Sequence, residues 1–106
     1  MTRPICGAPE ADAEFADAVG WYEEHRTGLG SEFLAAVREA RTLIEEHPNI
    51  GSAMRGAKRG ECGLMVRRFP YQLIYYVRSH DIVLVAGAHT KRRPSYWKRR
   101  AIPPAT

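Results

Sequence analysis

Cysteine is scarce in this sequence, which holds only Cys6 and Cys62 among its 106 residues. Two thiols are too few for a disulfide framework, and they lack the paired clusters of ligands that a structural zinc site needs. We therefore expect two reduced cysteines. We also expect no metal and no other cofactor.

Long apolar runs are missing as well. The longest, IVLVAGA from Ile82 to Ala88, is far too short to cross a bilayer, and no basic-then-apolar leader opens the chain. We therefore expect a cytoplasmic protein without membrane contact. A short glycine motif, Gly28-Leu29-Gly30, lacks the lysine and the preceding strand of a phosphate-binding loop, so it predicts a turn.

Acidic residues are almost absent from the second half of the chain. Residues 1–54 carry a net charge of −6, whereas residues 55–106 carry +10, with twelve Lys and Arg against Glu61 and Asp81. The cations are densest in AHTKRRPSYWKRR, residues 88–100. Such a separation of charge predicts that the second half attracts a polyanion or an acidic protein.

The first half has the apolar period of two helices. Apolar residues recur at helical spacing from Ala11 to Tyr22 and again from Phe33 to Ile44. We expect Gly28 to end the first helix in a left-handed conformation, Ser31 to cap the second, and Pro48 to end it. The short connection predicts an antiparallel helical hairpin.

The second half has the composition of strands. Residues 49–63 are punctuated by glycine and predict a loop, whereas residues 64–69, 71–78 and 82–89 are rich in β-branched and aromatic side chains. Short links between these runs favour an antiparallel meander, with the almost wholly apolar last strand at the centre. Residues 2–8 predict at best a poor edge strand, because they contain Pro4 and Gly7.

The expected fold is therefore α+β, a helical hairpin packed on a small antiparallel sheet in the order (β)-α-α-β-β-β. We expect one domain over residues 1–106, with its core at about 10–100 and a disordered tail at 101–106.

Three aromatic side chains are predicted to have structural roles. Trp21 and Tyr22 should close the hairpin against the sheet. Trp97 should be partly buried, because Pro94 introduces a bend before it and returns the chain to the core. His89, at the end of the last strand, should hydrogen-bond a neighbouring backbone group and orient a turn. Arg67 and Arg68 should point to opposite faces of a strand.

Three motifs in order resemble the RelE/ParE superfamily of bacterial toxins, in particular its ParE-like plasmid stabilisation branch. They are WYE with GLG (residues 21–30), RRFPY (67–71) and the closing AHTKRRPSYWKRR, and the match covers about residues 11–100. The resemblance implies the same β–α–α–β–β–β fold and a growth-inhibiting toxin of a type II toxin–antitoxin module. It also implies a cognate antitoxin as partner, with operator DNA contacted only through that antitoxin.

The resemblance leaves the mode of action open. ParE-like members poison DNA gyrase, RelE-like members cleave mRNA on the ribosome, and the weak first strand also allows an inactive relic. In the nuclease case, His89, Arg92 and Tyr96 are the candidate catalytic residues. Nuclease relatives usually carry an arginine where this chain has Gln72, which cannot stabilise a phosphorane.

We therefore favour a non-enzymatic inhibitor. The residues predicted to bind the target or the antitoxin are Arg68, Tyr71, His89, Arg92, Arg93, Tyr96 and Trp97.

Overall fold

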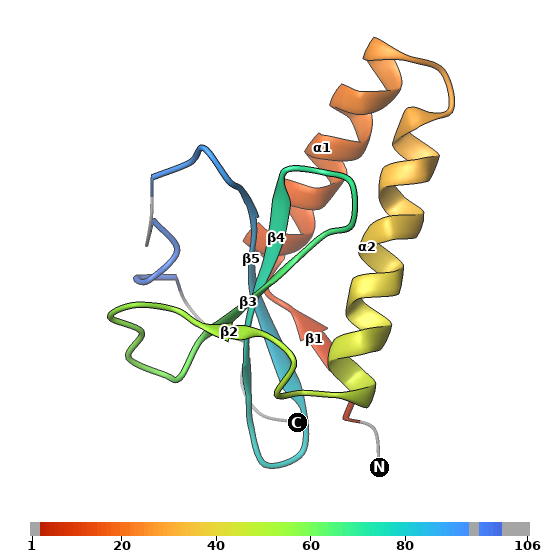
Figure 1. Ribbon diagram of the computed structural model, residues 1–106. Helices are drawn as coiled ribbons and strands as arrows, with labels where there is room; N and C mark the ends of the chain where they lie inside the picture. The colour runs from red at the N-terminus through yellow and green to blue at the C-terminus, as the bar shows by residue number, and fades with distance from the viewer. Residues whose placement is uncertain (1–2, 94–95, 101–106) are drawn as a thin grey trace.

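A computed structural model describes residues 3–93 and 96–100 of the chain (Figure 1). Its helices and strands follow the predicted order, with one additional short strand after the helices. The elements are β1 (Ile5–Gly7), α1 (Pro9–His25), α2 (Leu29–Glu46), β2 (Ser52–Ala53), β3 (Cys62–Met65), β4 (Tyr71–Val77) and β5 (Ile82–His89).

The strands form one mixed sheet in the order β1-β5-β4-β3-β2. The predicted meander is confirmed, since β3, β4 and β5 pair antiparallel in sequence. The first strand forms at one edge and pairs parallel to β5, with Ile5 opposite Ile82 and Gly7 opposite Leu84. The N-terminal strand thus makes an otherwise antiparallel sheet mixed, and β5 lies inside it as predicted.

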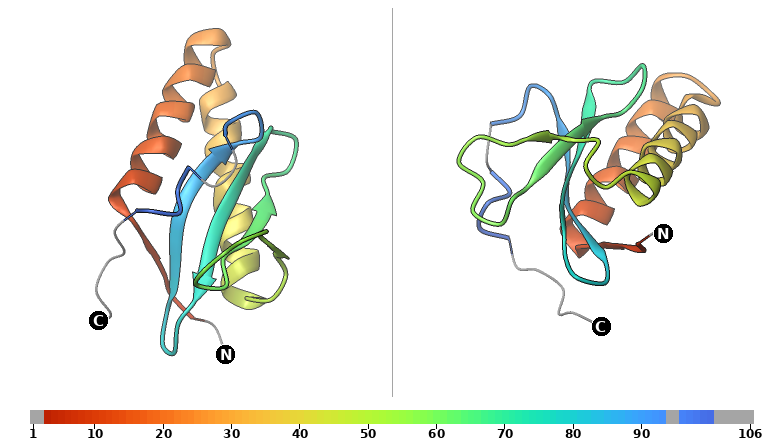
Figure 2. Two further views of the ribbon diagram at one scale, coloured as in Figure 1. Left: turned by 90° about the vertical axis from the view of Figure 1, so that its left-hand side faces the viewer. Right: turned by 60° about the horizontal axis from the view of Figure 1, so that its bottom comes forward.

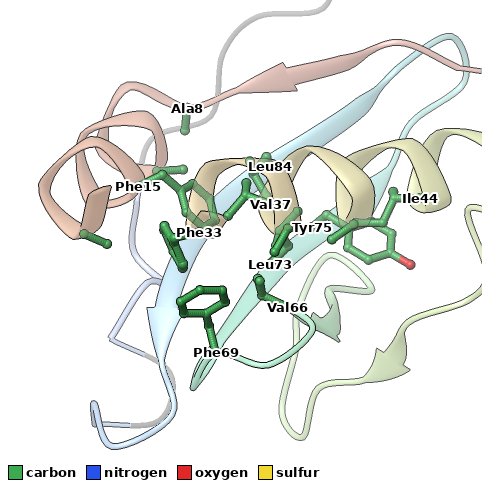
Figure 3. Packing of buried hydrophobic residues seen from close by; sticks show 14 of the residues in the cluster. Ala8, Phe15, Phe33, Val37, Ile44, Val66, Phe69, Leu73, Tyr75 and Leu84 are labelled. Atoms are coloured by element: carbon green, nitrogen blue, oxygen red, sulfur yellow. The ribbon is translucent and has the colours of Figure 1, made fainter. Parts of the chain in front are cut away.

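The two helices cover one face of the sheet, as predicted (Figure 1). Their apolar stripes meet a core in which Phe33, Phe69, Leu73 and Leu84 pack together (Figure 3). Phe33 and Phe69 meet edge to face, with ring centroids 5.0 Å apart. Burial of these stripes holds the hairpin at a fixed position on β4 and β5.

Gly28 is left-handed as predicted, with φ at 89°, but it does not end the first helix. The first helix ends at His25 with Arg26 as its C-cap residue, and Gly28 is the N-cap residue of α2. The second helix begins at Leu29, so Ser31 lies inside its first turn and the prediction that it caps the helix is wrong. The carboxylate of Glu23 takes over that role, since it accepts hydrogen bonds from the backbone N–H groups of Gly28 and Gly30 at 3.0 and 3.1 Å.

The predicted loop at 49–63 contains β2 and the first residues of β3. Ser52 pairs with Gly63 and Ala53 with Cys62, so the chain folds back on itself as a short hairpin. Gly56 and Gly60 supply the positive φ angles of the turn between them. A two-residue strand is too short to produce an alternating pattern in the sequence.

The predicted strand at 64–69 ends earlier than expected. Pairing in β3 stops at Met65, and residues after Val66 form a turn closed by the hydrogen bond from the N–H of Val66 to the carbonyl of Tyr71, at 2.8 Å. Arg68 lies in this turn with φ at 70°. The expected alternation of Arg67 and Arg68 across a strand is therefore wrong.

The face of the sheet opposite the helices is covered by the C-terminal segment, here residues 96–100 (Figure 2). Trp97 is buried there, with 2% of its surface exposed, against Ile74, Val83 and Val85. Its predicted burial is confirmed. Arg59 joins this segment to the turn after β2, because its Nη2 donates to the carbonyl of Lys98 at 3.2 Å.

Tyr22 is buried as predicted, but Trp21 is 55% exposed and does not close the hairpin against the sheet. Its indole instead stacks on His25, one turn later in α1. Pro94 and the tail at 101–106, for which a bend and disorder were predicted, lie outside the described residues. None of the helices that the structure describes is long and apolar enough to span a membrane.

Candidate binding site at the end of α1 and β5

The carboxylate of Glu14 on α1 is the centre of a cluster that joins the first helix to the end of the chain. It accepts hydrogen bonds from Nη1 and Nη2 of Arg100 at 2.6 and 2.8 Å and from the hydroxyl of Tyr96 at 2.6 Å. The backbone N–H of Gly87 adds a bond at 3.1 Å and Nη1 of Arg92 one at 3.3 Å. Five donors therefore converge on one largely buried carboxylate.

This cluster fills the edge of β5 where β1 has ended. Pairing with β1 reaches only as far as Leu84, so no strand among the described residues flanks the backbone of β5 beyond it on that side. Glu14 accepts the N–H of Gly87, and Arg100 donates to the carbonyl of Val85 at 3.1 Å. The two side chains thus satisfy backbone groups that an open sheet edge would leave unpaired.

The electrostatics of the cluster favour its charged state. Burial alone would raise the pKa of Glu14, but the hydrogen bonds from Arg100, Tyr96 and Gly87 outweigh it and hold that pKa below its ordinary value. Burial, and then the bond to Glu14, raise the pKa of the Tyr96 hydroxyl well above its ordinary value. Tyr96 is therefore a neutral donor at physiological pH.

Two arginines are stacked on the ring of Tyr96. The guanidinium carbon of Arg92 lies 4.0 Å from the ring centroid and that of Arg100 lies 4.8 Å from it. With Glu14 between them, these side chains are held by both cation–π contact and ion pairing. Arg93, by contrast, is exposed and makes no hydrogen bond or ion pair with the described residues.

His89 has the structural contact predicted for it. The backbone N–H of Lys91 donates to its Nδ1 at 3.0 Å, which orients the turn after β5. In the neutral imidazole the proton then lies on Nε2. The ring also meets Tyr71 edge to face, with centroids 5.0 Å apart.

A cavity of about 670 Å³ lies between α1 and the ends of β4 and β5; we call it the α1 pocket. The first helix contributes Glu14, Asp17, Ala18, Trp21 and Tyr22 to it. The sheet side contributes Pro70, Tyr71, Gly87, His89 and Arg92. The volume is in the range of small-ligand and peptide-anchor sites.

The structure brings together four of the residues predicted from the sequence to bind a partner. Tyr71, His89 and Arg92 line the α1 pocket, and the ring of Tyr96 stacks on the guanidinium of Arg92. Trp97 is buried on the other face of the sheet. Arg68 lies apart, beside α2, where its Nη2 is 3.4 Å from a carboxylate oxygen of Glu32.

The candidate nuclease set is engaged within the protein. The hydroxyl of Tyr96 donates to Glu14, Arg92 pairs with the same carboxylate, and Nδ1 of His89 accepts a backbone N–H. Gln72, where a phosphate-binding arginine would be expected, pairs with Met65 and Ala88 in the sheet. Among residues 3–93 and 96–100, no cluster of His, Cys, Asp and Glu could hold a metal ion.

Sequence reasoning missed Glu14, Asp17 and Arg100. Acidic residues on a helix surface normally face water, so Glu14 gave little signal. A signal does exist, since Glu14 follows Ala11 by three residues and precedes Ala18 by four, which places it beside the buried stripe. Its contact with Arg100, 86 residues away, has no local signature.

Comparisons with known proteins identify the family and the fold. The family model for the ParE toxin of type II toxin–antitoxin systems, parDE, matches residues 8–94. Among solved structures, a chain of the chromosomal ParDE TA system from P. aeruginosa shares the fold, with a TM-score of 0.69 and 14% identity. The alignment covers 85% of this chain and 98% of that chain. No curated protein matches the sequence. Because the family model spans most of its length, the chain belongs to the ParE toxin family of type II toxin–antitoxin systems.

Proposed function

We propose that this toxin stops growth by binding DNA gyrase in the cytoplasm and that a cognate antitoxin neutralises it by covering the same surface. Operator DNA would be contacted only through the antitoxin. Family membership supports a toxin with an antitoxin partner. The choice of a binding mechanism over a cleaving one rests on the side chains of the site.

The observation that carries this choice is the engagement of Glu14. A metal-independent ribonuclease needs a base for the 2′-hydroxyl, an acid for the leaving oxygen and a cation for the phosphate. Here the hydroxyl of Tyr96 and the guanidinium of Arg92 both bind Glu14. Because Glu14 already binds both the candidate acid and the candidate phosphate-binding cation, the arrangement favours binding of a protein partner over cleavage of RNA.

The surface proposed to hold the target or antitoxin surrounds the end of β5. Tyr71, His89 and Arg92 provide its pocket, and Arg93 supplies an exposed cation that makes no ion pair with any residue the structure describes. Tyr96 and Trp97 contribute indirectly. The ring of Tyr96 stacks on Arg92, and the buried Trp97 fixes the cationic segment on the sheet. Arg68 would make a separate contact at the edge of α2, where Glu32 already engages it in part.

The test uses purified gyrase and purified toxin. We expect the toxin to inhibit supercoiling of relaxed plasmid, or to trap cleaved DNA, at stoichiometric concentrations. Arg93→Ala should weaken the effect about fivefold or more, because it removes an exposed interface cation. Glu24→Gln, which changes an exposed charge on α1 outside the pocket, should behave as wild type.

Normal supercoiling at a large excess of folded toxin would rule out gyrase as the target. Sequencing of mRNA ends after induction then distinguishes the remaining mechanisms. Clustered cuts at codon boundaries would establish the ribosome-dependent nuclease, and neither effect together with normal growth would indicate an inactive relic.

A further inference from the structure

The wall of the α1 pocket formed by the first helix has a charge opposite to that of the C-terminal half. Asp17 lies on this wall, exposed, and makes no hydrogen bond or ion pair within the part of the chain that the structure describes. The other carboxylate of the wall, Glu14, is already bound by arginines. Asp17 is therefore the acceptor that a ligand in the pocket would meet.

The same wall presents an exposed aromatic ring. Trp21 is 55% exposed although tryptophan is among the most apolar side chains. Its ring is held in place by stacking on His25, with centroids 3.7 Å apart, and Nδ1 of His25 contacts the carbonyl of Trp21 at 2.7 Å. An ordered, exposed indole provides a flat surface for a planar group.

The floor of the pocket is apolar and aromatic. Tyr22 and Tyr71 lie with ring centroids 6.2 Å apart, and the small residue Ala18 also lines the pocket. At about 670 Å³, the cavity can take more than a single side chain of a partner. The pocket therefore has room for an apolar anchor residue of a partner together with an adjacent polar or charged side chain.

Within the part of the chain that the structure describes, no charged group of the opposite wall pairs with Asp17. Arg92 pairs with Glu14 at 3.3 Å and stacks on Tyr96, while Nδ1 of His89 accepts the N–H of Lys91. Their main interactions are made within the protein. Asp17 is a carboxylate without a charged partner among residues 3–93 and 96–100, so charge complementarity favours a cationic ligand group.

We propose that the α1 pocket binds a polypeptide segment of a protein partner through an arginine next to an apolar residue. The guanidinium pairs with Asp17 and stacks on Trp21, and the apolar side chain packs on Tyr22 and Tyr71. Arginine suits this wall better than lysine because its planar group both stacks on aromatic rings and forms bidentate bonds to carboxylates. The proposal rests on the proposed function, in which a partner polypeptide holds this toxin.

The test uses the whole ¹⁵N-labelled protein and three unlabelled probes, acetyl-Phe-Arg-amide, acetyl-Phe-citrulline-amide and acetyl-Phe-Glu-amide. Citrulline has nearly the shape of arginine without its charge. We expect the arginine probe to shift the indole N–H signal of Trp21 and the amides of Ala18 and Gly87, while the indole signal of the buried Trp97 stays in place.

Variants identify the acceptor. Asp17→Asn should weaken binding of the arginine probe about two- to fivefold, the range expected for an exposed ion pair. Binding of the citrulline probe should be unchanged. Glu24→Gln, an equal change of charge on the same helix outside the pocket, should have no effect. Trp21→Ala should weaken the arginine and citrulline probes alike, because it removes the stacking surface.

Equal binding of the arginine and citrulline probes would overturn the proposal, as would preferential binding of the glutamate probe. Shifts confined to residues outside the pocket, or no shifts at millimolar peptide, would overturn it as well. These outcomes are separate from the fate of the proposed function. Peptide binding is measured on purified protein and does not depend on toxicity, whereas failure to inhibit gyrase leaves the peptide result intact.

Discussion

At the scale of single residues, Glu14 connects parts of the chain that the sequence keeps far apart. The side chains of Glu14 and Arg100 are each only 14% exposed, and their charged groups meet at 2.6 Å. A partly buried pair of this kind contributes little beyond an apolar replacement, but removing one partner leaves the other charge desolvated. Glu14 should therefore be sensitive to substitutions that preserve its size.

We expect Glu14→Gln to lower the free energy of unfolding by about 2 kcal/mol, because Arg100 loses its countercharge while partly buried. Urea unfolding followed by circular dichroism measures this loss. Asp17→Asn changes a residue of the same helix that is exposed and makes no ion pair in the described part of the chain. It should change the stability by less than about 0.5 kcal/mol. Similar stabilities for all three proteins would show that the cluster does not hold the C-terminal segment.

The pKa shifts predict an acid-sensitive fold. Hydrogen bonds hold the pKa of Glu14 below its ordinary 4.5, and those from Arg78 hold the pKa of Asp81 below 3.8. Because both pKa values are depressed by folding, the stabilisation is complete above about pH 4.5 and is lost as the pH falls through the folded-state values.

The urea concentration at the midpoint of unfolding should accordingly decrease when the pH is lowered from 5 to 3. The decrease should be smaller in Glu14→Gln than in wild type. Parallel decreases in the two proteins would mean that Glu14 does not titrate as described.

Much of the site could be predicted from the residues of the closing cationic stretch, but its organising carboxylate could not. His89, Arg92 and Tyr96 stand out because aromatic and cationic side chains are concentrated near the end of a strand. Glu14 looks like any solvated acid of an amphipathic helix. Its role depends on β1 ending at Gly7, which exposes the edge of β5, and a tertiary contact of that kind leaves no periodic signal.

At the scale of elements, the helical hairpin depends on two glycines with different requirements. Gly28 has φ at 89°, a conformation that other residues adopt at a cost. A Cβ on Gly30 would lie 2.7 Å from the carbonyl oxygen of Val19, so α1 and α2 approach too closely there for a side chain. Gly20, in the middle of α1, has open space around its Cβ position.

Alanine substitutions at these three glycines should change the free energy of unfolding in opposite directions. Gly28→Ala and Gly30→Ala should each lower the free energy of unfolding by about 1 kcal/mol or more. Gly20→Ala should raise it by about 0.5–1 kcal/mol, since alanine favours helix. Thermal unfolding of the three variants measures the difference, and a loss of stability in Gly20→Ala would contradict the packing of α1.

The elements with a strong period were predictable, and the short ones were not. In both helices and in the central strand, many apolar residues recur at the positions that are buried. Their apolar pattern can therefore be recognised in the sequence without knowledge of tertiary contacts. The turn at Arg68 was predicted as a strand because the β-branched Val66 and the aromatic Phe69 are typical of strands. Both side chains are buried although they are three residues apart, a spacing that fits the turn and not a strand. At β2, only two residues pair, too few for any pattern.

At the scale of the whole molecule, the sheet is covered on both faces although residues 3–93 and 96–100 form only two helices. The C-terminal segment does for one face what the hairpin does for the other, and Trp97 is its buried anchor. The stretch in which the sequence concentrates its cations is thus also part of the fold. Losing its anchor should affect stability and binding together.

We expect Trp97→Ala to lower the free energy of unfolding by about 3 kcal/mol, the cost of a large buried aromatic, and Trp97→Phe by clearly less. The variant should also be cut by trypsin near residues 98–100 at concentrations that leave wild type intact. Protection of these sites in folded Trp97→Ala would show that other contacts hold the segment on the sheet.

The central claim, that this chain is an active toxin, is tested most directly by the survival of bacteria that are induced to make it. We predict a fall of at least about a hundredfold in colony-forming units after induction, and recovery when the adjacent antitoxin gene is expressed with it. Undiminished survival, with the folded protein detected in the cells at levels above that of gyrase, would contradict the account.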